Sequence, residues 1–260
     1  MFVPLVEFDQ VTLAYQDRPI LNRLSLSIPA QGLTLLLGPS GVGKTTLFKL
    51  ITGQICPDQG DVRINGQSMT QASLKVVYQL RKQMGMLFQS AALLSELTVF
   101  ENIGLPLKVH LKLTESTYQE RVHQALDHVG LSDAGALYPR QLSGGMSKRA
   151  AFARAMILNP VLMLYDEPLS AQDPVTCQSL LKLMHAEKIR QGHAGIVISH
   201  QIQSLLPIVD HIVLLDRTGI VFEGTPEAAS LSVQPLLRAF LSMENSGWLS
   251  DDDDFKLGER

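Results

Sequence analysis

The chain has 260 residues, of which 45% are hydrophobic and 18% charged, a composition typical of one large α/β domain or of a core with an inserted subdomain. The net charge is −3, and residues 246–260 alone carry five acidic and two basic residues, so the rest is neutral by count, which argues against nucleic acid as a partner. No apolar run reaches the roughly 20 residues of a membrane-spanning helix, and the N-terminus lacks the basic and apolar regions of a signal peptide.

The first predicted elements are antiparallel strands within residues 5–13. Apolar side chains that point to one side of this segment are Val6, Phe8, Val11 and Leu13. This loose alternation indicates strands with one buried and one solvated face.

A glycine-rich loop follows a strand predicted at residues 33–37, whose near-continuous apolar run suits a parallel strand buried on both faces. The loop is Gly38-Pro39-Ser40-Gly41-Val42-Gly43-Lys44-Thr45. A helix is predicted from Lys44 through Thr52, ending at Gly53. Strand, loop and helix in this order are typical of a P-loop, whose backbone N–H groups surround the phosphates of a nucleotide. In such a loop Lys44 adds a charge between the β- and γ-phosphates, and the Thr45 hydroxyl is placed to ligate Mg²⁺.

Between Ser90 and Leu158 the pattern becomes helical, without a strong strand signal. Within this stretch, Leu142-Ser143-Gly144-Gly145-Met146 opens an apolar helix. The start of that helix offers a second set of N–H donors and a positive dipole.

Further buried strands are predicted at residues 161–165, 195–199 and 211–215, and a turn at residues 216–219 leads into a hairpin strand at 220–222. We find no internal repeat, so we expect one nucleotide-binding unit per chain. Cys56 and Cys177 form no CxxC or metal-like spacing, and we expect both to be reduced thiols in a cytosolic protein.

An acidic pair, Asp166 and Glu167, ends the strand predicted at residues 161–165, at the edge where parallel sheets gather ligands. Asp166 suits the outer shell of Mg²⁺, and Glu167 can polarise the water that attacks the γ-phosphorus. A solvated turn is the alternative, but charge at the end of a buried strand is otherwise costly. We therefore predict a functional role for the pair.

The LSGG element lies between the P-loop and the acidic pair, and in this position it resembles the signature of the nucleotide-binding subunits of ABC transporters. In that family the element contacts ATP held by a second copy of the protein. The resemblance implies an ATPase that closes as a homodimer around two Mg-ATP and drives a membrane permease.

The fold implied by the resemblance is α/β: a P-loop NTPase (RecA-like) core with an antiparallel β subdomain and an inserted α-helical subdomain. One ABC ATPase domain would span residues 1–245, with its core at 1–89 and 159–245 and the helical subdomain at about 90–158. The acidic segment 246–260 is predicted to be a disordered tail.

The resemblance also assigns roles to single residues. His200 would be a switch histidine at the γ-phosphate, although a lone His is more often structural. Gln89 would complete the Mg²⁺ shell and transmit the presence of the γ-phosphate to the permease. Asp173 would lie at the interface between the two subunits of the dimer. Tyr15 would stack on adenine, with a core position in phase with Val11 and Leu13 as the alternative.

In total, the expected catalytic residues are Lys44, Glu167 and His200, and the expected Mg²⁺ ligands are Thr45, Gln89 and Asp166. The expected ATP contacts are Tyr15, Gly38, Pro39, Ser40, Gly41, Val42, Gly43, Lys44, Thr45, Thr46, Gln89, Ser143, Gly144, Gly145 and Asp173. Gln172 and Gln201 depart from the Leu and Asp that are frequent in the family, and neither change removes a catalytic group.

Several stretches resemble one branch of the family, the ATPases of the Mla phospholipid-transport system of Gram-negative bacteria. They are residues 53–58, residues 81–90, Gln172-Asp173-Pro174, and the LSGG element with Met146, Lys148-Arg149 and Ala150-Ala151 after it. This branch implies a permease docked near the Q-loop, the segment that contains Gln89, and near the helical subdomain, together with a STAS-domain regulator and a periplasmic lipid-binding subunit. The chain would then lie on the cytoplasmic face of the bacterial inner membrane, held there by the permease.

Two alternatives remain open. One is the ATPase of another ABC importer, such as an amino-acid importer. The other is a soluble ABC protein that acts on ribosomes or DNA. Ribosomal members usually carry two nucleotide-binding units in one chain, and DNA-repair members carry long coiled coils. This chain shows neither feature. Residues 1–245 also have no net charge by count, which argues against nucleic acid as a partner.

Overall fold

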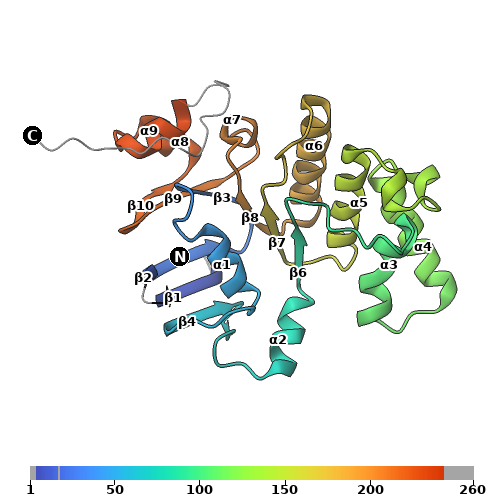
Figure 1. Ribbon diagram of the computed structural model, residues 1–260, viewed down its shortest axis with the longest axis horizontal. Coiled ribbons are helices and arrows are strands. Elements are labelled where there is room, and N and C mark those ends of the chain that lie inside the picture. The colour runs from blue at the N-terminus through green and yellow to red at the C-terminus, as the bar shows by residue number, and fades with distance from the viewer. Residues whose placement is uncertain (1–3, 17, 243–260) are drawn as a thin grey trace, which may run out of the picture.

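A computed structural model describes residues 4–16 and 18–242 of the protein; the predicted acidic tail, residues 246–260, lies outside this part. The larger sheet of the described chain has six strands in the order β10-β9-β3-β8-β7-β6 (Figure 1). Their bounds are β3 Gly32–Leu37, β6 Met84–Leu87, β7 Leu162–Asp166, β8 Ala194–Ile198, β9 His211–Asp216 and β10 Gly219–Gly224. All neighbours pair in parallel except β9 and β10, which form an antiparallel hairpin.

The parallel strands are buried on both faces. Leu35 and Leu37 belong to one hydrophobic cluster, while Leu36 between them belongs to the other. Because successive strand residues point to opposite faces, a strand between two apolar layers reads as an unbroken apolar run. Four predicted strands are thus confirmed, and each begins within one residue of the predicted start: residues 33–37, 161–165, 195–199 and 211–215.

Within the described residues a second sheet has four strands in the order β2-β1-β4-β5, and all neighbours in it pair antiparallel. Its strands are β1 Pro4–Tyr15, β2 Arg18–Pro29, β4 Gln59–Ile64 and β5 Gln67–Ser68. In β1, Phe8 pairs with Leu26 and Val11 with Leu24, so β1 holds one residue more than β2 over this step. Gln10 in this bulge has φ +51°. The bulge shifts the phase of the strand, and for that reason Val6, Phe8, Val11 and Leu13 are all buried on one side.

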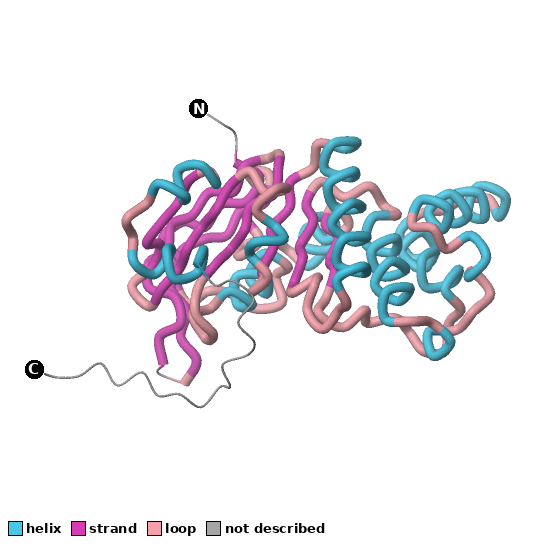
Figure 2. The backbone as a smooth tube through the Cα atoms, turned by 90° about the horizontal axis from the view of Figure 1, so that it is seen from above, coloured by secondary structure: helices cyan, strands magenta, loops and turns pink. Residues whose placement is uncertain are grey.

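Helices cover both faces of the six-stranded sheet, as the view from above also shows (Figure 2). Those that accompany the strands are α1 Lys44–Ile51, α2 Leu74–Arg81, α6 Pro174–Gln191, α7 Ile202–Leu205, α8 Pro226–Leu231 and α9 Pro235–Ser242. The side chains of α1 pack in the cluster between the two sheets, and α6 packs in the cluster on the opposite face. This arrangement confirms the α/β class.

The remaining helices lie together at one end of the molecule (Figure 1). They are α3 Val99–His110, α4 Glu115–His128, the short 3₁₀ turns Ser132–Ala134 and Pro139–Gln141, and α5 Gly144–Met156. α5 packs on α3 and α4 and also on β6 and α6, so it belongs to both parts of the molecule. The helical character predicted between residues 90 and 158 is confirmed, whereas the subdomain boundary placed there remains a prediction.

No helix within the described ranges is both long enough and apolar enough to cross a membrane.

Candidate functional site

The P-loop connects β3 to α1, and its backbone adopts conformations that are rare for residues with a side chain. Gly41 has φ +75° and Gly43 φ +107°, which glycine reaches without steric cost. The N-cap residue of α1 is Gly43, which has no side chain that could accept a hydrogen bond from the helix. The first N–H groups of α1 are therefore not capped by it and face the loop. Pro39, Ser40 and Thr45 are exposed, whereas Val42 is buried and anchors the loop. An exposed loop at the start of a helix, whose first N–H groups have no partner within the helix, has the form of an anion site.

Lys44 is the buried cation of this loop, with 8% of its surface exposed. Its Nζ donates to the carbonyl oxygens of Gly38 and, at 3.0 Å, of Pro39. Burial lowers the pKa of Lys44, and the charges of Glu167 and Asp166 oppose that shift. The ammonium group thus lies within electrostatic reach of the acidic pair.

The acidic pair stands where β7 ends. Asp166 is the last residue of β7, and Glu167 follows with φ +47°, a left-handed conformation uncommon outside glycine. The backbone N–H of Glu167 donates to the carbonyl of Ile198 at 2.9 Å, which fastens this turn to the end of β8. Burial raises the pKa of both carboxyl groups, and Lys148 and Lys44 counteract it at Asp166.

His200 meets Glu167 from the next strand. Its Nε2 lies 3.4 Å from Glu167 Oε1, and its backbone N–H donates to Glu167 Oε2 at 3.3 Å. The His200 side chain is 60% exposed and that of Glu167 14%, so the histidine covers a mostly buried carboxylate. The structure brings Lys44, Glu167 and His200 together at the carboxyl ends of β3, β7 and β8, as the parallel sheet requires.

Gln89 follows β6 at the same edge of the sheet. Its Nε2 donates to Ser170 Oγ at 3.3 Å, so its amide oxygen is the atom left for a metal. That oxygen, the Thr45 hydroxyl and the Asp166 carboxylate are hard oxygen donors, the type that Mg²⁺ prefers beside substrate phosphates and water. The donor set therefore fits Mg²⁺.

Tyr15 ends β1 and is 44% exposed, so the alternative of a core position is wrong. The stacking of adenine on its ring remains a prediction. Asp173 is exposed and caps α6, its Oδ1 accepting from the backbone N–H groups of Val175 and Thr176 at 3.0 Å each. Hydrogen bonds lower the pKa of Asp173, first the one from the Thr176 side chain and then those from the backbone of Thr176 and Val175. Its place at a dimer seam also remains a prediction.

The LSGG element opens α5, where Ser143 Oγ accepts from the backbone N–H of Met146 at 3.2 Å. Ser143 and Gly144 are exposed. In Figure 1, strands β8, β7 and β6 separate this end of the molecule from α1 and the P-loop. One chain therefore does not bring its LSGG element to its own P-loop.

Two basic residues of α5 were not predicted to belong to the site. Lys148 and Arg154 donate to backbone carbonyls of residues 88–92, the Q-loop. A sequence signal existed, because Lys148 precedes Ala151 and Phe152 by three and four positions and so shares their buried helix face.

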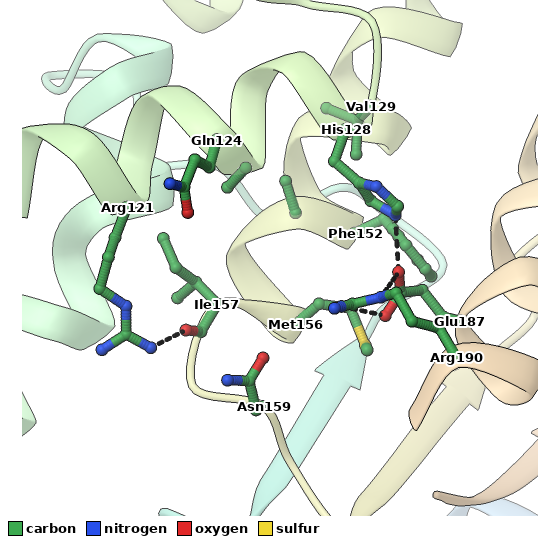
Figure 3. Close-up of a pocket in the computed structure, with 12 residues that line it drawn as sticks. Arg121, Gln124, His128, Val129, Phe152, Met156, Ile157, Asn159, Glu187 and Arg190 are labelled. Carbon is green, nitrogen blue, oxygen red and sulfur yellow. Dashed lines mark hydrogen bonds and ion pairs between the residues drawn. The ribbon is translucent and has the colours of Figure 1, made fainter. Parts of the chain in front are cut away.

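A cavity of about 340 Å³ lies elsewhere, between α4, α5 and α6 (Figure 3). On its wall the buried Glu187 pairs with His128 Nε2 at 2.6 Å and with an Arg190 nitrogen at 2.7 Å. None of the expected ATP contacts lines this cavity. It is separate from the P-loop edge of the sheet.

Comparison with known proteins agrees with this geometry. A family model described as ABC transporter matches residues 21–170. The intermembrane phospholipid transport system ATP-binding protein MlaF of Haemophilus influenzae is 39% identical, over 94% of this chain and 92% of the relative. The probable ribonucleotide transport ATP-binding protein mkl of Mycobacterium tuberculosis is 33% identical, over 93% of this chain and 67% of the relative. Among solved structures, the dimeric ATP-binding cassette MJ0796 in a post-hydrolysis state with ADP and Pi has a TM-score of 0.76 at 26% identity, covering 85% of this chain and 98% of that one.

Proposed function

The chain belongs to the ABC transporter family, and from this premise we propose that it hydrolyses ATP to drive a permease that moves phospholipid between the inner and outer membranes. The observation that carries the phospholipid assignment is the 39% identity to MlaF along nearly the whole of both chains. The similarity to mkl, at 33% identity and two thirds of that relative's length, is weaker. Phospholipid is therefore preferred to ribonucleotide as the cargo.

In the proposed reaction the P-loop binds and orients the triphosphate. Backbone N–H groups between residues 38 and 46 donate to the phosphate oxygens. Lys44 releases its hydrogen bonds to the Gly38 and Pro39 carbonyl oxygens and binds the β- and γ-phosphates instead. Thr45, Gln89 and Asp166 would hold Mg²⁺, which neutralises charge on the phosphates.

Glu167 is the proposed general base for the attacking water. Its carboxylate is mostly buried beside His200, and burial raises its pKa towards the range in which a base accepts a proton effectively. His200, at 3.4 Å from that carboxylate, holds its orientation and is placed to contact the γ-phosphate.

Each ATP is proposed to lie between two copies of the chain. The P-loop of one copy would hold the phosphates, while Ser143, Gly144 and Gly145 of the other would donate from the start of α5 to the γ-phosphate. Support comes from the separation of the two motifs within one chain and from the dimeric state of the related cassette MJ0796.

We further propose that the dimer binds an inner-membrane permease near the Q-loop and the helical end, on the cytoplasmic face. A STAS-domain regulator and a periplasmic lipid-binding subunit would complete the assembly.

Purification of the tagged chain from membranes of its native host tests this proposal. We expect an integral permease to co-purify and the reconstituted complex to move fluorescent phospholipid only with ATP, and not when Lys44→Ala replaces the wild type. If the tagged chain co-purified with an amino-acid permease, or with ribosomes and no membrane protein, the phospholipid assignment would be contradicted.

A further inference from the structure

Lys148 is a buried cation on the LSGG helix, with only 3% of its surface exposed. Its Nζ donates to the carbonyl oxygens of Phe88 at 3.2 Å and of Gln89 at 2.5 Å. Within the described ranges no carboxylate forms a salt bridge with it. A buried charge is costly unless polar groups surround it, and an apolar side chain here would avoid that cost. The geometry thus indicates a role beyond packing.

Arg154 repeats the contact further along the same helix. Its guanidinium donates to the carbonyl oxygens of Ala92 at 2.7 Å and of Ala91 at 3.1 Å. Together the two basic side chains bind four carbonyls within residues 88–92. This segment joins β6 of the sheet to the helical end of the molecule.

The charge of Lys148 also reaches the acidic pair. Among the charged groups that lower the pKa of Asp166 against its burial, Lys148 comes before the P-loop residue Lys44. Burial lowers the pKa of Lys148, and the charges of Cys177, Asp166 and Glu167, in that order, oppose this shift. Lys148 therefore contacts the Q-loop and also acts electrostatically on the acidic pair.

We propose that Lys148 is a positioning residue for ATP hydrolysis, which holds the backbone of Gln89 so that the Gln89 side chain faces the metal site and moves together with the LSGG helix. This inference rests on the proposed function, because it assigns Gln89 and Asp166 to Mg-ATP. Lys148 would link the Q-loop and the LSGG element of one chain, which contact different ATP molecules of the dimer. A change at one ATP site would therefore be transmitted to the other.

The test compares three variants in the full-length protein. Lys148→Met keeps the length of the side chain and removes its charge, and Lys148→Arg keeps the charge. Arg149→Met is the matched control, because Arg149 also donates to two carbonyls, those of Val129 and Gly130 at 2.8 and 3.1 Å, but away from the Q-loop.

For Lys148→Met we expect about a tenfold loss of kcat or a comparable rise in half-saturating Mg²⁺, in line with the effect of groups that orient metal ligands. Amide hydrogen exchange in residues 88–92 should become faster. Lys148→Arg should restore much of both, and Arg149→Met should change neither.

Unchanged exchange and an unchanged Mg²⁺ requirement in Lys148→Met would overturn the proposal. The same changes in Arg149→Met would also overturn it, since they would reveal general loosening of α5. A wild-type protein without ATPase activity would refute the proposed function instead, and hydrogen exchange would still decide whether Lys148 holds the Q-loop.

Discussion

Glu167 combines a mostly buried carboxylate, a left-handed backbone and contacts to the neighbouring strand β8. A non-glycine residue in that conformation costs of the order of 1–3 kcal/mol and persists only where its surroundings fix it. Here the hydrogen bond from its N–H to Ile198 and the approach of His200 fix it. In this conformation the carboxylate lies beside His200, at the carboxyl end of β8.

Glu167→Gln should bind ATP and hydrolyse it about 10²–10⁴-fold more slowly, because an amide cannot accept the proton of the attacking water. ATP-bound dimers should therefore accumulate on a sizing column. Turnover near that of the wild type would show that another group is the base.

The sequence locates Lys44, Asp166, Glu167 and His200 because each follows a buried strand, and parallel strands end at one edge. It does not reveal that Glu167 and His200 lie 3.4 Å apart, nor that Tyr15 is exposed. The first depends on the turns that follow β7 and β8, and the second on the end of β1, where the register shifts between Leu13 and Ala14; local patterns fix neither.

Among the elements, α6 connects the sheet to the helical end through Glu187. This carboxylate is fully buried and pairs with His128 of α4 and Arg190 of its own helix, beside the cavity (Figure 3). Burial alone would raise the pKa of Glu187, but the hydrogen bonds and charge of Arg190 and the charge of His128 hold it below the ordinary value of a glutamate. A lowered carboxyl pKa means that the ionised form stabilises the fold.

Glu187→Gln should lower the free energy of unfolding at neutral pH by about 1–3 kcal/mol, because the half-exposed partners can return to water while a buried amide loses charged hydrogen bonds. The stabilisation by Glu187 is present above the unfolded pKa and is lost as pH falls through the folded value, so the difference from wild type should shrink below about pH 4.5. Urea denaturation across pH measures it. Asp127→Asn, an exposed acid on α4, is the control, and an equal loss in both variants would contradict the account.

Strands β2 and β6 show why some elements escape prediction. β2 carries Arg23 at φ +47°, which breaks its alternation as Gln10 does in β1. β6 is short and contains Gly85, where a Cβ would lie 2.5 Å from the carbonyl oxygen of Ala155 in α5. Close approach of a helix selects glycine there, against the usual strand composition.

At the scale of the whole molecule, the P-loop and the LSGG element lie on opposite sides of strands β8, β7 and β6 (Figure 1). The order of motifs along the chain is visible in the sequence, but this separation depends on how α5 packs against the sheet. The central claim is that two chains complete each ATP site.

The structure selects Gly144 for testing that claim. A Cβ at Gly144 would be 3.5 Å from Gln172 Oε1, an ordinary contact, whereas one at Gly145 would be 2.7 Å from Thr176 Oγ1. Gly144→Asp therefore places a carboxylate at the exposed start of α5 with little disturbance of its own chain. Like-charge repulsion with the γ-phosphate of a second copy should abolish hydrolysis but leave ATP binding to the P-loop.

The most direct measurement is the ATPase activity of mixed dimers of Gly144→Asp and Lys44→Ala chains, isolated through two different affinity tags. If the LSGG element acts on the partner's ATP, one site of each mixed dimer carries both lesions and the other carries none. Activity should then reappear, although each variant alone is inactive. If the element acts within its own chain, every site keeps one lesion. Mixed dimers that bind ATP and remain inactive would contradict the account.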